Sequence, residues 1–186
     1  MRRTILALAV LGFVFGGATF SARAAEPAAK AAPTGFRAEY IAEVNSVGKK
    51  LTDLAGAMPA EKYSWRPAPG IRSVSEVYVH VAGGDYLIPS FMGAKVPEGI
   101  TRDMEKTVTE KAKVQEVVRQ SFEHARKAAE GLSDADLARE IKLFGQPTTV
   151  GGMLFVMANH MHEHLGQSIA YARTNGVVPP WSAGKE

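Results

Sequence analysis

The 186-residue sequence contains no cysteine, and this absence removes several kinds of site at once. Without thiols the chain forms no disulfides, offers no thiolate to a metal and has no cysteine nucleophile. The lipid-modified cysteine of bacterial lipoproteins is excluded for the same reason. Any chemistry must therefore come from other side chains.

A net positive charge is also missing once the N-terminal segment is set aside. The whole chain has 22 lysines and arginines against 19 acidic residues, which gives a formal charge of +3. Residues 1–24 contain Arg2, Arg3 and Arg23 but no acidic residue, so 19 basic residues face 19 acidic ones in the remainder. With a net charge of zero this remainder has no overall field to attract nucleic acid, and we expect no nucleic-acid partner.

Apolar runs are short, and the longest lies near the N-terminus. Residues 5–15 are almost all apolar, follow two arginines and precede small residues that end in an A-x-A site after Ala24. This layout predicts a cleavable signal peptide over residues 1–24 and a periplasmic or otherwise exported protein. The alternative is an uncleaved membrane anchor, although the run is shorter than the roughly 20 residues of a membrane span. We expect no stable membrane insertion after cleavage.

The rest of the chain reads as a flexible linker and one helical domain. Residues 25–33 are mostly alanine and proline, which predicts a linker, and the domain covers residues 34–186. Apolar residues make up 46% of the chain and charged residues 22%, which is the composition of a globular protein. Apolar residues recur every three or four positions over residues 34–57, which predicts the first amphipathic helix.

Three further helices are predicted from caps and periodicity. Ser73 and Glu76 form a capping-box pattern before the second helix, residues 74–92, which Pro89 should kink or end. The same pattern at Thr107 and Glu110 predicts a third helix over residues 107–131. The fourth begins at Thr148 or Thr149 and ends before residues 175–176. Residues 133–147 are expected to connect them with one short helical turn near 135–140, and no segment predicts a strand. The expected fold is an all-α four-helix bundle.

Histidines on two of these helices are candidates for a metal site. His160 and His164 lie four residues apart, so their side chains project from one helix face, one turn apart. Such a pair can hold one ion, yet it also occurs by coincidence in cores and on surfaces. His80 is the best third ligand, since it follows Val77 by three residues on the presumed buried side of the second helix. Gly83 and Gly84, one turn later, leave room beside its imidazole or allow close helix packing.

Two motifs resemble the DinB family of DinB/YfiT-like metal-binding helix bundles. The first is W-x-P-x-x-G-x-x-S-V-x-E from Trp65 to Glu76, followed by His80, and the second is H-x-x-x-H-x-G-Q from His160 to Gln167. The resemblance spans nearly the whole mature chain and implies that His80, His160 and His164 are the metal ligands. Many relatives have a further histidine where this chain has Glu163.

Three histidine ligands leave a fourth position open for water or substrate, as in catalytic zinc sites. We expect one divalent transition metal, Zn, Ni, Fe or Mn, with Zn or Ni favoured, and a metal-dependent hydrolase acting on an unknown small molecule. A thiol transferase and a non-catalytic metal- or ligand-binding bundle remain alternatives, and a homodimer is compatible with the sequence.

The catalytic residues stay undetermined. Glu163 and Gln167 are candidates for residues that contact the metal ligands rather than the metal itself. Glu163 is also a candidate general base. Further polar candidates for the pocket are Glu76, Asp85 and Tyr86, whereas His124 and His162 read as ordinary surface residues.

Overall fold

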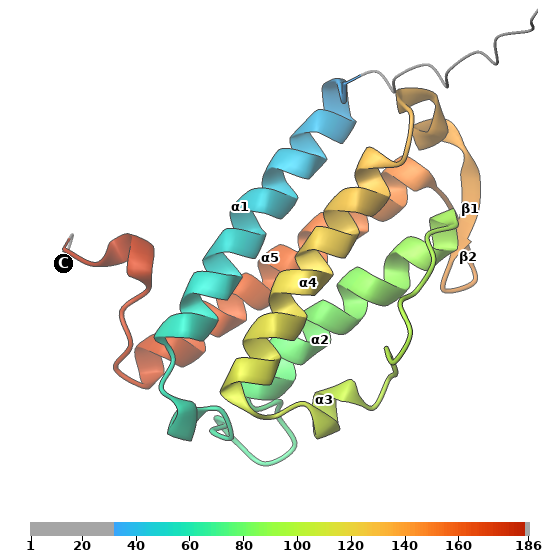
Figure 1. Ribbon diagram of the computed structural model, residues 1–186. Coiled ribbons are helices and arrows are strands. Elements are labelled where there is room, and N and C mark those ends of the chain that lie inside the picture. Colours follow the sequence, from blue (N-terminus) through green and yellow to red (C-terminus); the bar gives the residue numbers. More distant parts are fainter. Residues whose placement is uncertain (1–31, 185–186) are drawn as a thin grey trace, which may run out of the picture. The chain divides into compact units, whose positions relative to one another are not determined.

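The computed structural model describes residues 32–184, and four long helices dominate this part of the chain (Figure 1). They are α1 (Gly35–Ala57), α2 (Val74–Leu87), α4 (Lys111–Glu130) and α5 (Val150–Thr174). The predicted signal peptide, residues 1–24, and most of the predicted linker, residues 25–33, lie outside the described residues. The prediction of a helical bundle is confirmed.

The four long helices pack around one apolar core. Helix α1 contacts α4 and α5, and α2 contacts the same two helices from the other side. Each helix contributes side chains that are almost completely buried, for example Leu51, Val81, Val118 and Met153. Burial of these apolar side chains supplies the main driving force for assembly. Between residues 32 and 184, no helix is both long enough and apolar enough to cross a membrane.

Most predicted helix ends are confirmed. Ser73 and Glu76 form the predicted capping box at the start of α2, each side chain bonding to the other residue's backbone. Thr149 caps α5 by accepting a hydrogen bond from the backbone of Gly152. Helix α2 ends at Leu87 and continues as the 3-10 helix η2 (Ile88–Met92), which contains Pro89. Gly176 follows α5 in the left-handed conformation, with φ of 74°.

The predicted start of the third long helix was wrong. Helix α4 begins at Lys111 rather than at Thr107, and Glu110 precedes it without a side-chain cap. Thr107 instead closes a separate short helix, α3 (Met104–Thr107), and its hydroxyl donates to the carbonyl of Asp103. Val108 is extended and separates the two helices. This short helix lies beside α2, where it becomes important for the site.

The expectation that no strand would form was also wrong. After the 3-10 helix η3 (Asp134–Ala138), strands β1 (Glu140–Leu143) and β2 (Gln146–Thr149) pair as an antiparallel hairpin. Phe144 and Gly145 form its two-residue turn, with positive φ values of 50° and 84°. Strands of four residues are too short to give a firm alternating pattern, and Pro147 within β2 argued against a strand.

Candidate metal centre

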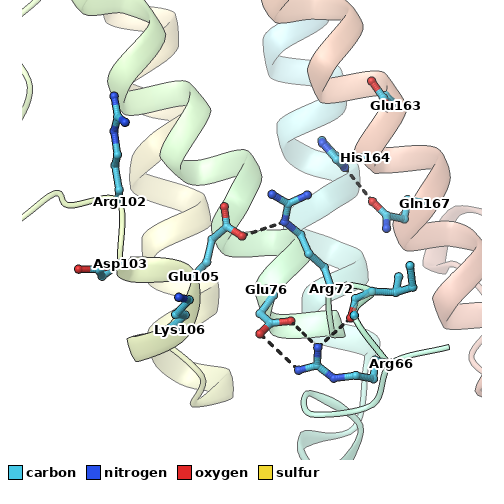
Figure 2. A pocket seen from close by; sticks show the side chains of 12 residues that line it. Arg66, Arg72, Glu76, Arg102, Asp103, Glu105, Lys106, Glu163, His164 and Gln167 are labelled. Carbon is cyan, nitrogen blue, oxygen red and sulfur yellow. Dashed lines mark hydrogen bonds and ion pairs between the residues drawn. The ribbon is translucent and has the colours of Figure 1, made fainter. Parts of the chain in front are cut away.

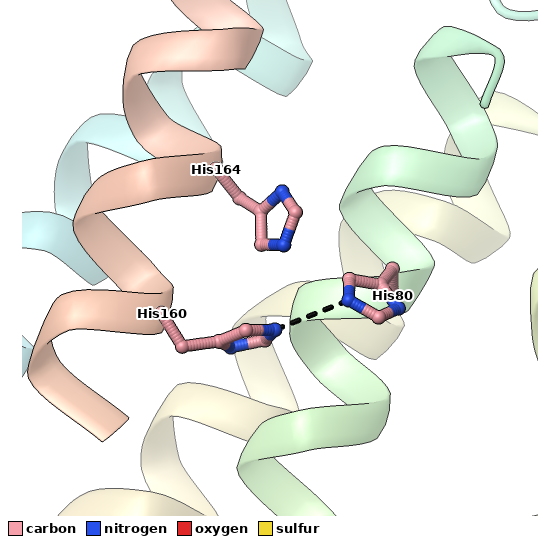
Figure 3. Close-up of side chains that lie close together, drawn as sticks. All are labelled: His80, His160 and His164. Carbon is pink, nitrogen blue, oxygen red and sulfur yellow. Dashed lines mark hydrogen bonds between the residues drawn. The ribbon is translucent and has the colours of Figure 1, made fainter. Parts of the chain in front are cut away.

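Three histidines from two helices meet at one point of the bundle. His80 comes from α2, whereas His160 and His164 come from successive turns of α5, the neighbouring helix (Figure 3). One nitrogen from each ring lies within 4.8 Å of the others, and His160 Nε2 is 3.2 Å from His80 Nε2. The rings meet edge to face, with centroids 4.7 to 5.1 Å apart. The structure therefore brings together the three histidines that the sequence singled out.

A carboxylate and an arginine hold His80 in place. His80 Nδ1 lies 2.6 Å from Glu105 Oε1, and the other oxygen of Glu105 accepts a hydrogen bond from Arg72 Nε at 2.8 Å. With Nδ1 engaged by the carboxylate, Nε2 of His80 faces the other two rings. A carboxylate that orients a histidine in this way is common behind metal ligands. Sequence reasoning missed Glu105 and Arg72, because both lie in segments without helical periodicity.

A second chain of hydrogen bonds orients His164. Its Nδ1 lies 2.8 Å from Gln167 Oε1, the amide of Gln167 donates to the hydroxyl of Tyr171, and that hydroxyl donates to the carbonyl of Arg72. The indole of Trp65 packs edge-on against Tyr171 at 5.2 Å. The hydrogen bonds behind His80 and those behind His164 thus both reach Arg72, the first through its side chain and the second through its backbone carbonyl. Gln167 thus contacts His164 directly.

Burial favours the neutral imidazole at two of the three histidines, His160 and His164. Burial, helped by the nearby charges of His164, His80 and Arg72, lowers the pKa of His160 to about 4. Burial also lowers the pKa of His164, although the hydrogen bond to Gln167 acts in the opposite direction. Burial alone would raise the pKa of Glu105, but the hydrogen bonds from Arg72 and His80 outweigh it and lower that pKa. Neutral rings at His160 and His164 are the protonation state in which imidazole binds a metal.

A glycine makes room for His160. A Cβ atom on Gly84 would lie 2.7 Å from Cε1 and 3.1 Å from Nδ1 of that imidazole, whereas a Cβ on Gly83 would meet nothing within 4 Å. The sequence suggested that these glycines leave room beside His80 or let the helices pack closely; in the structure Gly84 accommodates the ring of His160 from α5.

An open pocket of about 820 Å³ borders His164 (Figure 2). His164, Glu163 and Gln167 line one side, and the loop before α2 and helix α3 line the other. Four basic and four acidic side chains line it: Arg66, Arg72, Arg102, Lys106, Glu76, Asp103, Glu105 and Glu163. Figure 2 shows the guanidinium of Arg72 between Glu105 and His164. A pocket of this size can take a small molecule.

Several other sequence candidates lie elsewhere. His162 is exposed and bonds to Glu43 at 2.7 Å, away from the site, as predicted. His124 was expected on the surface, but its ring is partly buried against Tyr86 between α2 and α4, since α4 turns that side toward the bundle. Tyr86 is not among the pocket residues, and its hydroxyl donates to the carbonyl of Val117. Glu76 does line the pocket, held by the capping box and by Arg66.

Asp85 is likewise buried in the bundle rather than in the pocket. Its side chain is 1% exposed and accepts a hydrogen bond from the hydroxyl of Ser121 on α4 at 3.2 Å. Burial raises its pKa well above the usual value, against the opposing effect of Ser121. Burial raises the pKa values of Tyr40 and Tyr86, and the carboxylate charge of Asp85 adds to this effect. This carboxyl is a structural feature of the α2–α4 interface.

The three histidines fit a divalent transition metal. Each offers an imidazole nitrogen to the same small volume. Nδ1 of His80 is hydrogen-bonded to Glu105, and Nδ1 of His164 to Gln167. Oxygen-seeking ions such as magnesium and calcium prefer carboxylates, whereas three imidazoles suit zinc, nickel or iron. The donor set thus agrees with the expected class of ion without selecting one metal.

Comparison with known proteins gives the same picture of the fold. Residues 43–168, more than half of the chain, match the sequence model of the DinB superfamily. Among curated proteins, none matches this chain.

Solved structures share the fold, among them those of three proteins from Bacillus species. A DinB-like protein from Bacillus cereus ATCC 10987 is 22% identical, with a TM-score of 0.63 over 78% of this chain and 93% of the other. The DinB-like protein YjoA from Bacillus subtilis is 21% identical, with a TM-score of 0.62 and coverages of 75% and 93%. YfiT from Bacillus subtilis, described as a probable metal-dependent hydrolase with an unusual four-helix bundle topology, is 16% identical, with a TM-score of 0.61 and coverages of 82% and 97%.

Proposed function

This chain belongs to the DinB superfamily, and from that premise we propose that it is an exported, metal-dependent hydrolase. Its metal is held by His80, His160 and His164. The observation that carries the proposal is their convergence beside an open pocket, with nitrogens within 4.8 Å of one another. The description of YfiT as a probable metal-dependent hydrolase supports the same class of reaction.

The protein's own residues supply a rigid and partly accessible ligand set. Glu105 and Gln167 fix the ring orientations of His80 and His164, so little ordering is left to be done when an ion binds. A divalent ion there would act as a Lewis acid toward water or a polarised substrate oxygen. His164 lines the pocket, which gives a substrate direct access to this side of the site.

Glu163 is the candidate base. It lies on α5 immediately before His164 and forms part of the pocket wall (Figure 2). Glu76 and Glu105, two other acids of the pocket, are held by Arg66, Arg72 and His80. Glu163 is exposed, and within the part of the chain that the structure describes it forms no ion pair. It can therefore accept the proton that water loses as the water oxygen bonds to the substrate, and return that proton to the departing group as the substrate bond breaks.

The identity of the metal and the location of the protein complete the proposal. Zinc or nickel is favoured by the imidazole donors, and the N-terminal sequence pattern supports export to the periplasm or its equivalent. The substrate is a small molecule.

The test is elemental analysis of protein purified without a histidine tag, with variants of five histidines. We expect about one equivalent of metal in the wild type, and its loss in His160→Ala and His164→Ala. His80→Ala should weaken binding and remove much of the loss of melting temperature that a chelator causes, because binding to the folded state raises its stability by RT ln(1 + [L]/Kd).

His124→Ala and His162→Ala are the matched controls and should keep their metal, since neither side chain reaches the site. Equal loss from all five variants would show that the ligands are wrongly assigned. A fully loaded His80→Ala variant that responds to chelator like the wild type would remove His80 from the site. Bound metal without turnover on ester, amide and phosphoester substrates would favour a non-catalytic metal-binding bundle.

A further inference from the structure

The side chain of Arg72 lies beside the histidines and is only partly engaged by protein. Its Nε donates to Glu105, which fixes the position of the guanidinium. In Figure 2 the guanidinium lies between Glu105 and His164, with one terminal amino group on the side of His164. The side chain is 43% exposed, so its terminal amino groups are accessible from the pocket.

Shared contacts place the same guanidinium close to the candidate ligands. Arg72 shares the carboxylate of Glu105 with His80, and it lines the same pocket as His164. A molecule bound at the histidines is therefore within reach of Arg72.

The charge of the whole pocket favours an anion once a metal is present. The lining has equal numbers of basic and acidic side chains. A divalent ion at the histidines therefore leaves a net positive pocket, and Arg72 adds a planar pair of donors that matches the two oxygens of a carboxylate or phosphate.

We propose that Arg72 is the substrate-binding residue of this site, and that the substrate carries an anionic oxygen group, a carboxylate or phosphate, which the two terminal amino groups of Arg72 bind beside the histidines. This inference rests on the proposed metal site. Glu105 thereby serves two functions, since it orients His80 and holds Arg72 in position for the anion.

Three small probes test the proposal by calorimetric titration of zinc-loaded protein: acetate, its neutral counterpart acetamide, and inorganic phosphate. Wild-type protein should bind at least one of the two anions more tightly than acetamide, and which one it prefers identifies the anionic group. Arg72→Gln should lower the affinity for that anion by roughly tenfold or more, as expected for loss of a charge-assisted pair of hydrogen bonds. The affinity for acetamide should stay unchanged. Arg72→Lys, which keeps the charge but not the planar pair of donors, should show an intermediate loss.

Arg66→Gln is the matched control. Arg66 lines the same pocket, but Glu76 and the carbonyl of Ile71 hold its guanidinium, so its loss should change anion binding little. Zinc content is measured for each variant, because Arg72 also supports Glu105 and His80. An anion that binds equally well to zinc-loaded wild type and Arg72→Gln would overturn the proposal, and so would an equal loss in Arg66→Gln.

The metal site and the anion site can be tested separately. If the wild type takes up no zinc or other metal, the proposed function fails. The same titrations on metal-free protein then decide the role of Arg72, since an anion preference that disappears in Arg72→Gln supports it and its absence refutes it.

Discussion

Replacing Gly84 by alanine tests how closely α2 approaches the imidazole of His160. The added Cβ would lie 2.7 Å from Cε1 and 3.1 Å from Nδ1 of that ring. A carbon–carbon distance of 2.7 Å is far inside van der Waals contact, so the ring or the helix must move. The imidazole is the end of a side chain and can rotate when no metal holds it. A ring that coordinates a metal has no such freedom.

Gly83→Ala is the matched control for this substitution. Gly83 precedes Gly84 in α2, and a Cβ there would meet nothing within 4 Å. Both substitutions replace an interior helical glycine, so both should stabilise the helix by up to about 1 kcal/mol. The difference between the two variants therefore isolates the contact with His160.

The contact should affect metal affinity more than the stability of the metal-free protein. Overpacking in a well-ordered site costs about 1–3 kcal/mol. In metal-free Gly84→Ala the His160 ring can rotate away from the new methyl group, which avoids most of this cost. The cost is incurred on metal binding, because the ring must then return to the metal. The expected loss of affinity is roughly 5- to 150-fold relative to Gly83→Ala, at 1.4 kcal/mol per tenfold change.

Two measurements check this prediction. Competition with a chromophoric chelator gives the metal affinity of each variant, and denaturant unfolding of the metal-free proteins gives their stability. We expect Gly83→Ala to bind metal like the wild type and to be slightly more stable. Wild-type affinity in Gly84→Ala would refute the placement of His160 against α2. Equal weakening in both variants would show that backbone flexibility in α2, and not this contact, controls binding.

Three further predictions concern the surroundings of the site, the core and the N-terminus. Glu105→Gln should weaken metal binding by roughly 10- to 100-fold, the usual effect of removing a carboxylate behind a ligand, while Asp103→Asn in the same pocket should not; equal affinities in a chelator competition would count against Glu105. Because burial raises the pKa of Asp85, the folded protein keeps a proton that the unfolded chain loses above about pH 4, so stability should fall as pH rises from there to the folded pKa, by up to about 1.4 kcal/mol per pH unit. Urea unfolding of Asp85→Asn should lack this part of the pH dependence, and a profile parallel to the wild type would contradict it. Intact-mass measurement of the exported protein should show a chain that begins near Ala25, and retention of residues 1–24 would exclude a cleaved signal peptide.

The long helices could be predicted because their signals are local. Apolar spacing marks α1, and capping residues mark the starts of α2 and α5 at Ser73 and Thr149. Helix α4 shows the limit of this approach, because the pattern at Thr107 and Glu110 suits a cap but the chain forms a separate short helix there. The hairpin was missed because its pairing, which sets Glu140 against Thr149, joins two segments that are each too short to predict a strand.

The two parts of the candidate site were open to sequence reasoning to different degrees. The phase of a single helix determined that His160 and His164 share a face, since residues four apart project in the same direction. His80 was chosen from its phase and from motifs that resemble the DinB family, and only the packing of α2 beside α5 places it with the others.

By itself, the sequence determined a helical domain without thiol chemistry, with a histidine pair on its last helix. Only the tertiary structure decided what surrounds that pair. Glu105 reaches His80 from a short helix 25 residues away, and Arg72 joins both chains of hydrogen bonds through its side chain and its carbonyl. These contacts depend on how non-periodic connections fold back onto α2 and α5. Local spacing carries no information about them, because their energy comes from partners distant in the sequence.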